Sequence, residues 1–513
     1  MTESAETMTD KPELPHCDLV MKGGITSGVV YPLAVKRLSE AYRFRQIGGT
    51  SAGAIAAVFT AAAEYGRESG GFDKITALPD ALSISLLEKF QPTPELAPLF
   101  RLLLAVQSGK RRLILWALCR NYPWAAIVWG LPGAMIAILA LIASGPVAWG
   151  WLVLGALLLC AGAVTGPVLA AKRQATRDLV HHDYGICTGR TQPGYSKDSA
   201  LCDWMVRQID DMAGLAPDTG PLTVRMLKDA DINIRTVTTD LTTHRPYLLP
   251  MENNLHAFCH REFRAIFADS VVDHMVRCSN RVRDDWQNAD KTLHYFQVDD
   301  LPVVVLARMS LSFPGLISAV PLHRIDYTLV NAPMAQKRRR CLFSDGGISS
   351  NFPLHLFDHV LPLSPTFGIS LAEFDPLRAD ETAPYGGRID LPTDPGDGRL
   401  LRTRPFTGLG AFLMAILNSA KDWQDAMQAV LTGNRERVVT VNLTEDQGGM
   451  NLQMPKATID QLSEYGDLAG QALVAGFDRD QHRLRRFLTE LPAIEELLAE
   501  FSDHWQAVEP EPG

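Results

Sequence analysis

Short apolar runs separated by glycine-rich turns fill the N-terminal part of the chain. The run CDLVMK, Cys17–Lys22, stops at two glycines, which is typical of a short buried strand. Apolar residues recur at helical spacing over Gly28–Ala41, and Tyr42–Ile47 has the pattern of a second strand. The alanine-rich run Ala52–Ala63 predicts a helix. Strand, glycine loop, helix, strand, tight turn and helix in this order predict a parallel α/β sheet.

A different pattern occupies the middle of the first half of the chain. No Asp, Glu, Lys or Arg lies between Arg120 and Lys172. The segments Trp124–Ala143 and Ala148–Ala171 are each long enough to cross a hydrocarbon core of roughly 30 Å as a helix. The alternative is a buried hairpin in a soluble core, but core helices rarely stay this apolar over two full lengths. We therefore predict a transmembrane helical hairpin, inserted at residues 121–171, with a turn at Ser144–Pro146.

Basic residues flank this predicted hairpin on both sides. They are Lys110, Arg111, Arg112 and Arg120 before it, and Lys172, Arg173 and Arg177 after it. Positive charge at both ends places both ends on the cytoplasmic side of a membrane. The sequence therefore predicts a two-span membrane protein whose remaining residues face the cytoplasm. Gly162 and Gly166 form a GxxxG pattern, which favours close helix packing.

The α/β texture returns after the hairpin. Ala200–Ala213 has helical spacing, and Asp231–Asp240 alternates like a strand. Arg340–Ser344 has the pattern of a strand that leads into Asp-Gly-Gly. Thr366–Leu371 has the pattern of a further strand. Val438–Leu443 predicts one more strand in a C-terminal region that otherwise has a helical pattern.

Composition changes divide the chain into four regions. Residues 1–16 are polar, without the apolar segment of a secretory signal, and predict a disordered tail. Residues 17–372 form the predicted α/β domain that contains the hairpin. Residues 373–399 are rich in Pro, Gly and charge, which indicates a linker or exposed loop. Residues 400–513 form a mainly helical C-terminal extension.

Charge and cysteine content narrow the function classes. The chain has 49 Lys and Arg against 58 Asp and Glu, a net charge of −9, and no strongly basic region. This balance argues against nucleic acid as the main partner. The eight cysteines are far apart, with no CxxC pair and no His/Cys cluster at metal-ligand spacing. They read as reduced core thiols, and the sequence predicts no metal site.

The stretch Gly49-Thr50-Ser51-Ala52-Gly53 places a serine between two glycines, after a predicted strand and before a predicted helix. A serine hydroxyl is a poor nucleophile, so it needs a nearby base and donors for the oxyanion that forms. Gly-x-Ser-x-Gly in this context has the form of a nucleophile elbow built on Gly49, Ser51 and Gly53. The alternative is a glycine-rich turn in which Ser51 only caps a helix.

Two further glycine-rich stretches have matching chemistry. MKGGITSGVVYP, Met21–Pro32, joins a strand to a helix, so its backbone N–H groups are candidates to face an anion beside Ser51. It is not a nucleotide loop, because GxxxxGK[ST] is absent and Ile25 stands where GxGxxG has its middle glycine. In SDGGISSNFP, Ser344–Pro353, the carboxylate of Asp345 is a candidate base; the alternative is a surface Asp-Gly turn.

These three elements, in this order, resemble the patatin-like phospholipase family, and the likeness covers roughly Cys17–Leu371 without the hairpin. Ala307–Pro321, ARMSLSFPGLISAVP, resembles that family's Ala-Ser-x-x-x-Pro stretch. The resemblance implies a parallel-sheet α/β sandwich with helices on both faces. It also implies that Ser51 is the nucleophile and Asp345 its base. The amides that would form the oxyanion hole are those of Gly23, Gly24 and Ile25.

Two positions depart from the family pattern. Ile25 stands where the family usually has a third glycine, and Ser27 stands where it usually has a basic residue. An amide at Ile25 still donates a hydrogen bond. The missing positive charge is expected to weaken binding of an anionic head group.

The resemblance and the hairpin together predict a membrane-associated serine lipid acyl hydrolase with a Ser–Asp dyad, an acyl-enzyme and no metal or organic cofactor. Its expected partners are membrane phospholipid, or another lipid ester, and the bilayer itself. One alternative is a patatin-fold membrane scaffold or regulator without catalysis. Another is a Ser–His–Asp α/β-hydrolase that uses His355 or His359. The sequence leaves the head group, the acyl position and the oligomeric state open.

Overall fold

The computed structural model describes residues 14–507. Its gaps are at residues 25, 144, 217–218, 253–254, 285, 289–290, 360, 378–383, 393–402, 404–407, 410–411, 413–414, 417–418, 420–434 and 450. Ile25, most of the predicted N-terminal tail, and much of the predicted linker and the start of the C-terminal extension therefore lie outside the described residues.

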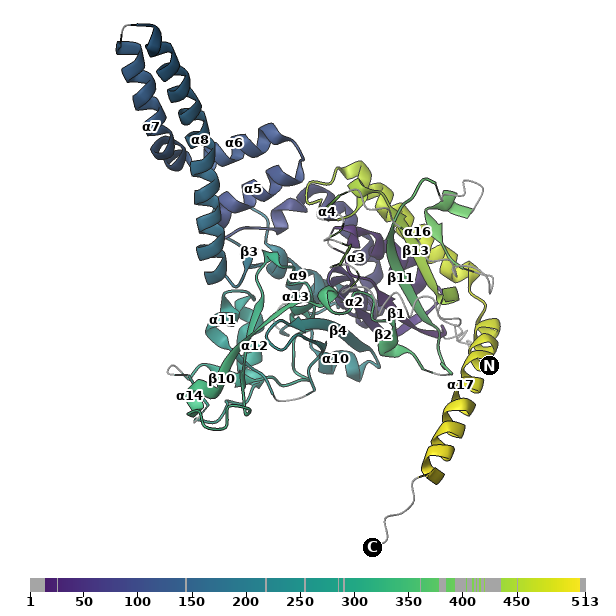
Figure 1. The fold of residues 1–513 in the computed structure, drawn as a ribbon. Coiled ribbons are helices and arrows are strands. Elements are labelled where there is room, and N and C mark those ends of the chain that lie inside the picture. Colours follow the sequence, from purple (N-terminus) through teal and green to yellow (C-terminus); the bar gives the residue numbers. More distant parts are fainter. Residues whose placement is uncertain are drawn as a thin grey trace, which may run out of the picture.

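A large mixed sheet forms the centre of the protein (Figure 1). Its strands are β1 (His16–Met21), β2 (Arg43–Gly49), β4 (Asn233–Asp240), β5 (Arg245–Leu249), β6 (Ala257–Cys259), β7 (Leu293–Tyr295), β9 (Val320–Ile325), β10 (Arg338–Asp345), β11 (Thr366–Glu373), β12 (Ile389–Asp390) and β13 (Val438–Leu443). Within the described residues their order is β12-β13-β11-β1-β2-β4-β10-β9-β6-β7, with β5 paired to β4. A separate pair is formed by β3 (Gly185–Cys187) and β8 (Gly315–Ile317).

The prediction of a parallel sheet is correct for only part of this sheet. Strands β13, β11, β1, β2 and β4 run parallel to one another, in this order across the sheet. Strand β10 is antiparallel to both β4 and β9, and β5, β6 and β7 also pair in antiparallel fashion. For β5 the reason is its connection to β4. A short turn joins the two strands, whereas a parallel pair needs a long crossover connection.

The α-helices pack mainly around the parallel part of the sheet. Those of the body are α1 (Tyr31–Ser39), α2 (Ala52–Tyr65), α3 (Gly71–Thr76), α4 (Leu78–Ser85), α5 (Ala97–Gln107), α6 (Arg111–Asn121), α9 (Leu201–Met212), α10 (Val224–Asp229), α11 (His260–Arg264), α12 (Asp269–Cys278), α13 (Val303–Ser310), α14 (Met334–Lys337), α16 (Lys456–Gly476) and α17 (Arg479–Ala507). Helix α2 contacts β2, α13, α3 and α9, so it is the central helix of this layer. Strands β1, β2, β4, β10, β11 and β13 and helices α2 and α9 lie where the sequence pattern predicts them.

Alternating side chains of β1 explain why the sequence reads as a continuous apolar run. Leu19 and Met21 belong to the main core beneath the helices. Val20 points to the opposite face, where it packs with Phe352 and Phe357 of the segment that follows β10. A strand that is buried on both faces needs apolar residues at every position. The segment after β10 is thereby fixed against the sheet.

The C-terminal region completes this architecture. Strand β13 pairs in parallel with β11, and helix α16 packs against α1. Gly466 of α16 lies so close to α1 that an added Cβ would come within 2.0 Å of the Val30 carbonyl oxygen. The described part of this region is therefore packed onto the α/β body.

The two long apolar segments form helices α7 (Pro123–Ile142) and α8 (Pro146–His181), which lie side by side and extend away from the body (Figure 1). Both are long and apolar enough to cross a membrane. In the most apolar stretch of each, only 17% and 22% of the residues are buried, which does not fit the core of a soluble domain.

Small residues bring α7 and α8 together. An added Cβ at Gly162 would lie 2.0 Å from the Trp129 carbonyl oxygen, and one at Gly166 would lie 2.4 Å from that of Ala125. The GxxxG pattern read from the sequence therefore lies at the contact between the two helices, where glycine permits close backbone approach.

Candidate active site

Ser51 lies at a sharp turn between the end of β2 and the start of α2. Its backbone has φ 55° and ψ −127°, a conformation that residues other than glycine rarely adopt. Such strain persists only where the surroundings enforce it, and it is concentrated at functional sites. Here the Ser51 N–H donates a hydrogen bond of 3.1 Å to Ser310 Oγ, which itself donates to the Val237 carbonyl oxygen.

The two glycines of the predicted elbow are required by close backbone contacts. A Cβ at Gly49 would lie 2.3 Å from the Gly53 carbonyl oxygen, and a Cβ at Gly53 would lie 2.2 Å from that of Met21. These contacts press the first turn of α2 against the end of β1. The structure has no room for a side chain at Gly49 or Gly53, which explains the two glycines of the Gly-x-Ser-x-Gly pattern.

Asp345 lies at the end of β10, directly beside Ser51. The Ser51 hydroxyl donates a hydrogen bond of 2.7 Å to Asp345 Oδ2, and Ser51 Oγ lies 3.3 Å from the Gly24 carbonyl oxygen. The other carboxylate oxygen, Oδ1, accepts a 2.7 Å hydrogen bond from the Gly347 N–H. Both side chains are buried. A carboxylate held in this way is placed to take the serine proton without an intervening histidine.

The two candidate histidines lie elsewhere. His355 is exposed in the 3-10 turn η6 (Leu354–Phe357). His359 is also exposed and lines a surface pocket with Arg45 and Gln46. No histidine is among the described residues that line the cavity around Ser51 and Asp345.

The glycine loop after β1 borders the same cavity, but its amides are not all directed into it. The Gly23 N–H donates a 2.8 Å hydrogen bond to the Asn351 carbonyl oxygen, which also accepts one of 2.7 Å from Thr50 Oγ1. The Gly24 carbonyl oxygen accepts from the Ala52 N–H. The Gly23 N–H must therefore break its hydrogen bond to the Asn351 carbonyl oxygen before it can donate to a substrate oxyanion. Ile25 lies outside the described residues.

Asn351 is a site residue that the sequence reasoning missed. Its side-chain oxygen is so close to Gly23 and Gly347 that a Cβ at either would lie 2.2 Å or 2.8 Å from it. Both glycine motifs therefore meet at one asparagine. Asn351 stands in the run SSNFP after Asp-Gly-Gly, so the sequence does show an amide side chain near Asp345. Nothing in that run indicates that this side chain contacts the loop at Gly23.

Comparison with known proteins shows which family the chain resembles. A family model described as patatin-like phospholipase matches residues 19–141 and 220–358. A protein of Rhizobium meliloti (strain 1021) named RpoH suppressor is 33% identical over 545 aligned positions, which cover 91% of this chain and 83% of that protein.

The chain belongs to the patatin-like phospholipase family. Membership implies a lipid acyl hydrolase with lipid ester substrates. Among solved structures, VipD from Legionella pneumophila is 14% identical, with a TM-score of 0.31 over 91% of this chain and 67% of that one.

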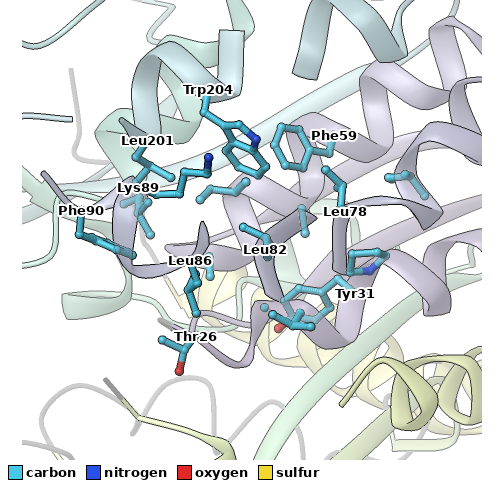
Figure 2. Close-up of a pocket in the computed structure, with 18 of the residues that line it drawn as sticks. Thr26, Tyr31, Phe59, Leu78, Leu82, Leu86, Lys89, Phe90, Leu201 and Trp204 are labelled. Carbon is cyan, nitrogen blue, oxygen red and sulfur yellow. The ribbon is translucent and has the colours of Figure 1, made fainter. Parts of the chain in front are cut away.

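In this patatin-like chain an apolar pocket lies next to the elbow, since its lining includes Ala52. Figure 2 shows residues that line it, among them Phe59, Leu82 and Trp204. One wall is the face of α2 that begins at Ala52, the residue after Ser51, and Phe313 lines both this pocket and the Ser51 cavity. The remaining walls are mostly aliphatic and aromatic, with Leu78, Leu82, Leu86, Leu201 and Trp204 among them. Its cavity volume is about 90 Å³.

One charged residue, Lys89, also lines this pocket. The side chain is buried, with its amine 3.5 Å from an Asp198 carboxylate oxygen and 5.6 Å from the centre of the Trp204 ring. The Asp198 carboxylate compensates the positive charge of Lys89 at this wall of the pocket.

Helix α13 and the turn after it hold the backbone at both Ser51 and Asp345. Ser310 accepts the Ser51 N–H, as described above, and the Ser312 carbonyl oxygen accepts the Asp345 N–H at 3.0 Å. Arg308 is fully buried and donates to Ser312 Oγ and to the carbonyl oxygens of Thr188 and Ser318. Burial lowers the pKa of this guanidinium from its usual value. The segment Ala307–Pro321, which resembles the family's Ala-Ser-x-x-x-Pro stretch, therefore fixes the backbone on which Ser51 and Asp345 lie.

Proposed function

We propose that this patatin-like protein is a membrane-associated serine lipid acyl hydrolase that uses Ser51 and Asp345 as a catalytic dyad. The observation that carries the proposal is the 2.7 Å hydrogen bond from the Ser51 hydroxyl to Asp345 Oδ2. Ser51 Oγ attacks the ester carbonyl carbon, and its proton passes to Asp345. The tetrahedral intermediate then collapses, the alcohol leaves with the proton from Asp345, and an acyl-serine remains.

The second half of the reaction repeats these steps with water. Asp345 accepts a proton from a water molecule that attacks the acyl carbonyl, and it returns that proton to Ser51 Oγ as the fatty acid leaves. The dyad is regenerated, and neither half of the reaction requires a metal or an organic cofactor.

The oxyanion of each tetrahedral intermediate needs nearby N–H donors. The glycine loop borders the cavity, so we assign this role to the amides of Gly24 and Ile25, with Gly23 as a further donor once its bond to the Asn351 oxygen opens. Ser27 lines the cavity as a neutral side chain, which fits a substrate whose ester region carries little negative charge.

The apolar pocket behind Ser51 is the proposed site of the acyl chain. Ala52, Ala56 and Phe59 of α2 offer it a hydrocarbon surface that starts at the nucleophile. An acyl group bound there places its carbonyl carbon at the pocket mouth beside Ser51.

Helices α7 and α8 are the proposed membrane anchor. Their outward faces carry large apolar side chains, including the indoles of Trp124 and Trp149, which are 77% and 72% exposed. Basic residues at both ends of the hairpin support an orientation with the α/β body on the cytoplasmic side. The dyad is then held near a surface where lipid esters are concentrated.

Labelling with a fluorophosphonate probe tests the nucleophile. Intact protein should be labelled and should hydrolyse a lipid ester, whereas Ser51→Ala should do neither. Ser39→Ala is the matched control, because Ser39 is also buried but only donates to the Lys36 carbonyl oxygen. Equal labelling of Ser51→Ala and intact protein would exclude Ser51 as nucleophile.

The same assay separates the alternative functions. The dyad predicts that His355→Ala and His359→Ala keep their activity, whereas a Ser–His–Asp mechanism predicts that one of them loses it. A folded intact protein that neither reacts with the probe nor hydrolyses any ester would instead support a non-catalytic scaffold.

A further inference from the structure

Three potential metal ligands meet inside the sheet, away from the apolar pocket. They are Asp240 at the end of β4, His256 directly before β6, and Cys341 on β10. One donor atom from each lies within 4.8 Å of the other two. All three side chains are buried, at 0%, 1% and 0% exposure.

His256 is the unusual member of this cluster. Neither of its ring nitrogens has a hydrogen-bond partner among the described residues, although its ring is buried. The ring stands at right angles to the neighbouring rings of Tyr247 and Phe343. A buried polar group without a partner costs free energy, so this imidazole is expected to have a partner other than the described residues.

The Asp240 side chain is also held in place. The Asp240 carboxylate accepts hydrogen bonds from the Thr242 N–H at 2.8 Å and from Thr243 Oγ1 at 2.7 Å, which fix its orientation. Such outer hydrogen bonds are usual for carboxylates that bind metals.

We propose that Asp240, His256 and Cys341 bind one Zn²⁺ ion. Imidazole, thiolate and carboxylate are the three side-chain types that zinc takes, and soft thiolate ligands argue against Mg²⁺ or Ca²⁺. Binding releases the thiol proton of Cys341 to solvent, and a water molecule fills the fourth position. Cys341 lies far along the chain from Asp240 and His256, which is why spacing did not reveal this ligand set.

The position of the cluster gives the ion a structural role. Cys341 and Asp345 lie on the same face of β10, separated by four residues, or roughly 13 Å of strand. The ion is therefore too far away to touch substrate at Ser51. It would link β4, β10 and the start of β6, and so stabilise the strand that carries Asp345.

Metal content and cobalt spectroscopy of the full-length protein test this proposal independently of any hydrolase activity. Protein purified without a polyhistidine tag or chelator should contain one zinc per chain. After replacement of zinc by Co²⁺, it should show a thiolate-to-cobalt charge-transfer band. Cys341→Ser should lose that band, and Cys259→Ser should keep it. Cys259 is the control because it is also buried, on neighbouring β6, with its sulfur 3.1 Å from Thr292 Oγ1.

His256→Phe provides a variant that retains the packing against Tyr247 and Phe343 while it removes both ring nitrogens. Chelation should lower the Tm of the intact protein by several degrees and leave that of His256→Phe unchanged, because only the intact protein has bound metal to lose. Folded intact protein that takes up neither zinc nor Co²⁺, or a charge-transfer band that survives in Cys341→Ser, would overturn the proposal.

Discussion

Ser51 and Asp345 are 294 positions apart in the chain, yet the hydroxyl of one donates a 2.7 Å hydrogen bond to the carboxylate of the other. Strand β4 brings them together. Gly49, at the end of β2, pairs with Thr236 on one side of β4, and Asp345, at the end of β10, pairs with Thr238 on the other. The proposed nucleophile and the proposed base are thus positioned by a single strand between them.

Asp345→Asn should lower kcat by several orders of magnitude while the protein remains folded. An asparagine oxygen can still accept the Gly347 N–H, but its NH₂ group cannot take the Ser51 proton. Steady-state hydrolysis and the thermal unfolding midpoint should be measured together. Activity within tenfold of the unmodified protein would contradict the dyad.

Gly53→Ala should unfold the elbow or prevent expression of folded protein, because the new Cβ would lie 2.2 Å from the Met21 carbonyl oxygen. Gly448→Ala is the matched control, since its nearest neighbour, the Thr444 carbonyl oxygen, is 3.8 Å away. Urea denaturation compares the two. If both variants were equally stable, the close packing of the elbow on β1 would be wrong.

Asp18 on β1 should make stability depend on pH. Burial raises the pKa of this carboxyl from 3.8 to about 6, and Oδ1 has no hydrogen-bond partner among the described residues. The folded state therefore holds the proton more tightly than the unfolded state. Its contribution to stability is present below about pH 4, is lost as the pH rises to about 6, and stays absent above that value.

Asp18→Asn removes this titration. Between pH 4 and pH 7 the unfolding free energy of the unmodified protein should fall relative to that of the variant by about 2–3 kcal/mol. Chemical denaturation at both pH values measures the difference. A constant difference between the two proteins across this range would show that Asp18 titrates normally.

Ala56→Leu should narrow the apolar pocket behind Ser51, since Ala56 lies on the wall that α2 forms. We expect hydrolysis of long-chain esters to fall about tenfold more than that of an acetyl ester, because only a long chain occupies the filled space. Comparing kcat/KM for a series of acyl lengths measures this. An equal loss for all lengths would place the acyl chain elsewhere.

Deletion of residues 121–171, with a short linker in their place, should release protein from membranes without loss of the dyad. Helices α7 and α8 contact mainly each other and extend from the body, so the sheet should fold without them. The deleted form should keep activity on a water-soluble ester. Relative to the intact protein, it should lose more activity on bilayer phospholipid than on that ester, because it no longer stays at the membrane surface.

Carbonate extraction of both forms, followed by the two assays, checks this expectation. The intact chain should stay with the membrane pellet. Its release by carbonate, or aggregation of the deleted form, would show that the hairpin is part of the folded core.

Local patterns in the sequence determined the elements that carry the dyad. The apolar run of β1, the glycines around Ser51 and the strand that ends at Asp345 reflect short-range sterics and periodicity, which any neighbouring structure must respect. The same holds for α7 and α8, because twenty or more apolar residues without charge allow few other structures. Their membrane insertion remains a prediction.

Tertiary structure alone decided what surrounds these elements. The antiparallel half of the sheet, the capture of the Gly23 N–H by Asn351, and the support of Asp345 by Arg308 through Ser312 all join segments far apart in the chain. The sequence shows which residues are able to pair, but strand order decides which of them meet. The cluster of Asp240, His256 and Cys341 likewise has no recognisable spacing in the sequence, because three strands have to pack before its donor atoms come within reach of one ion.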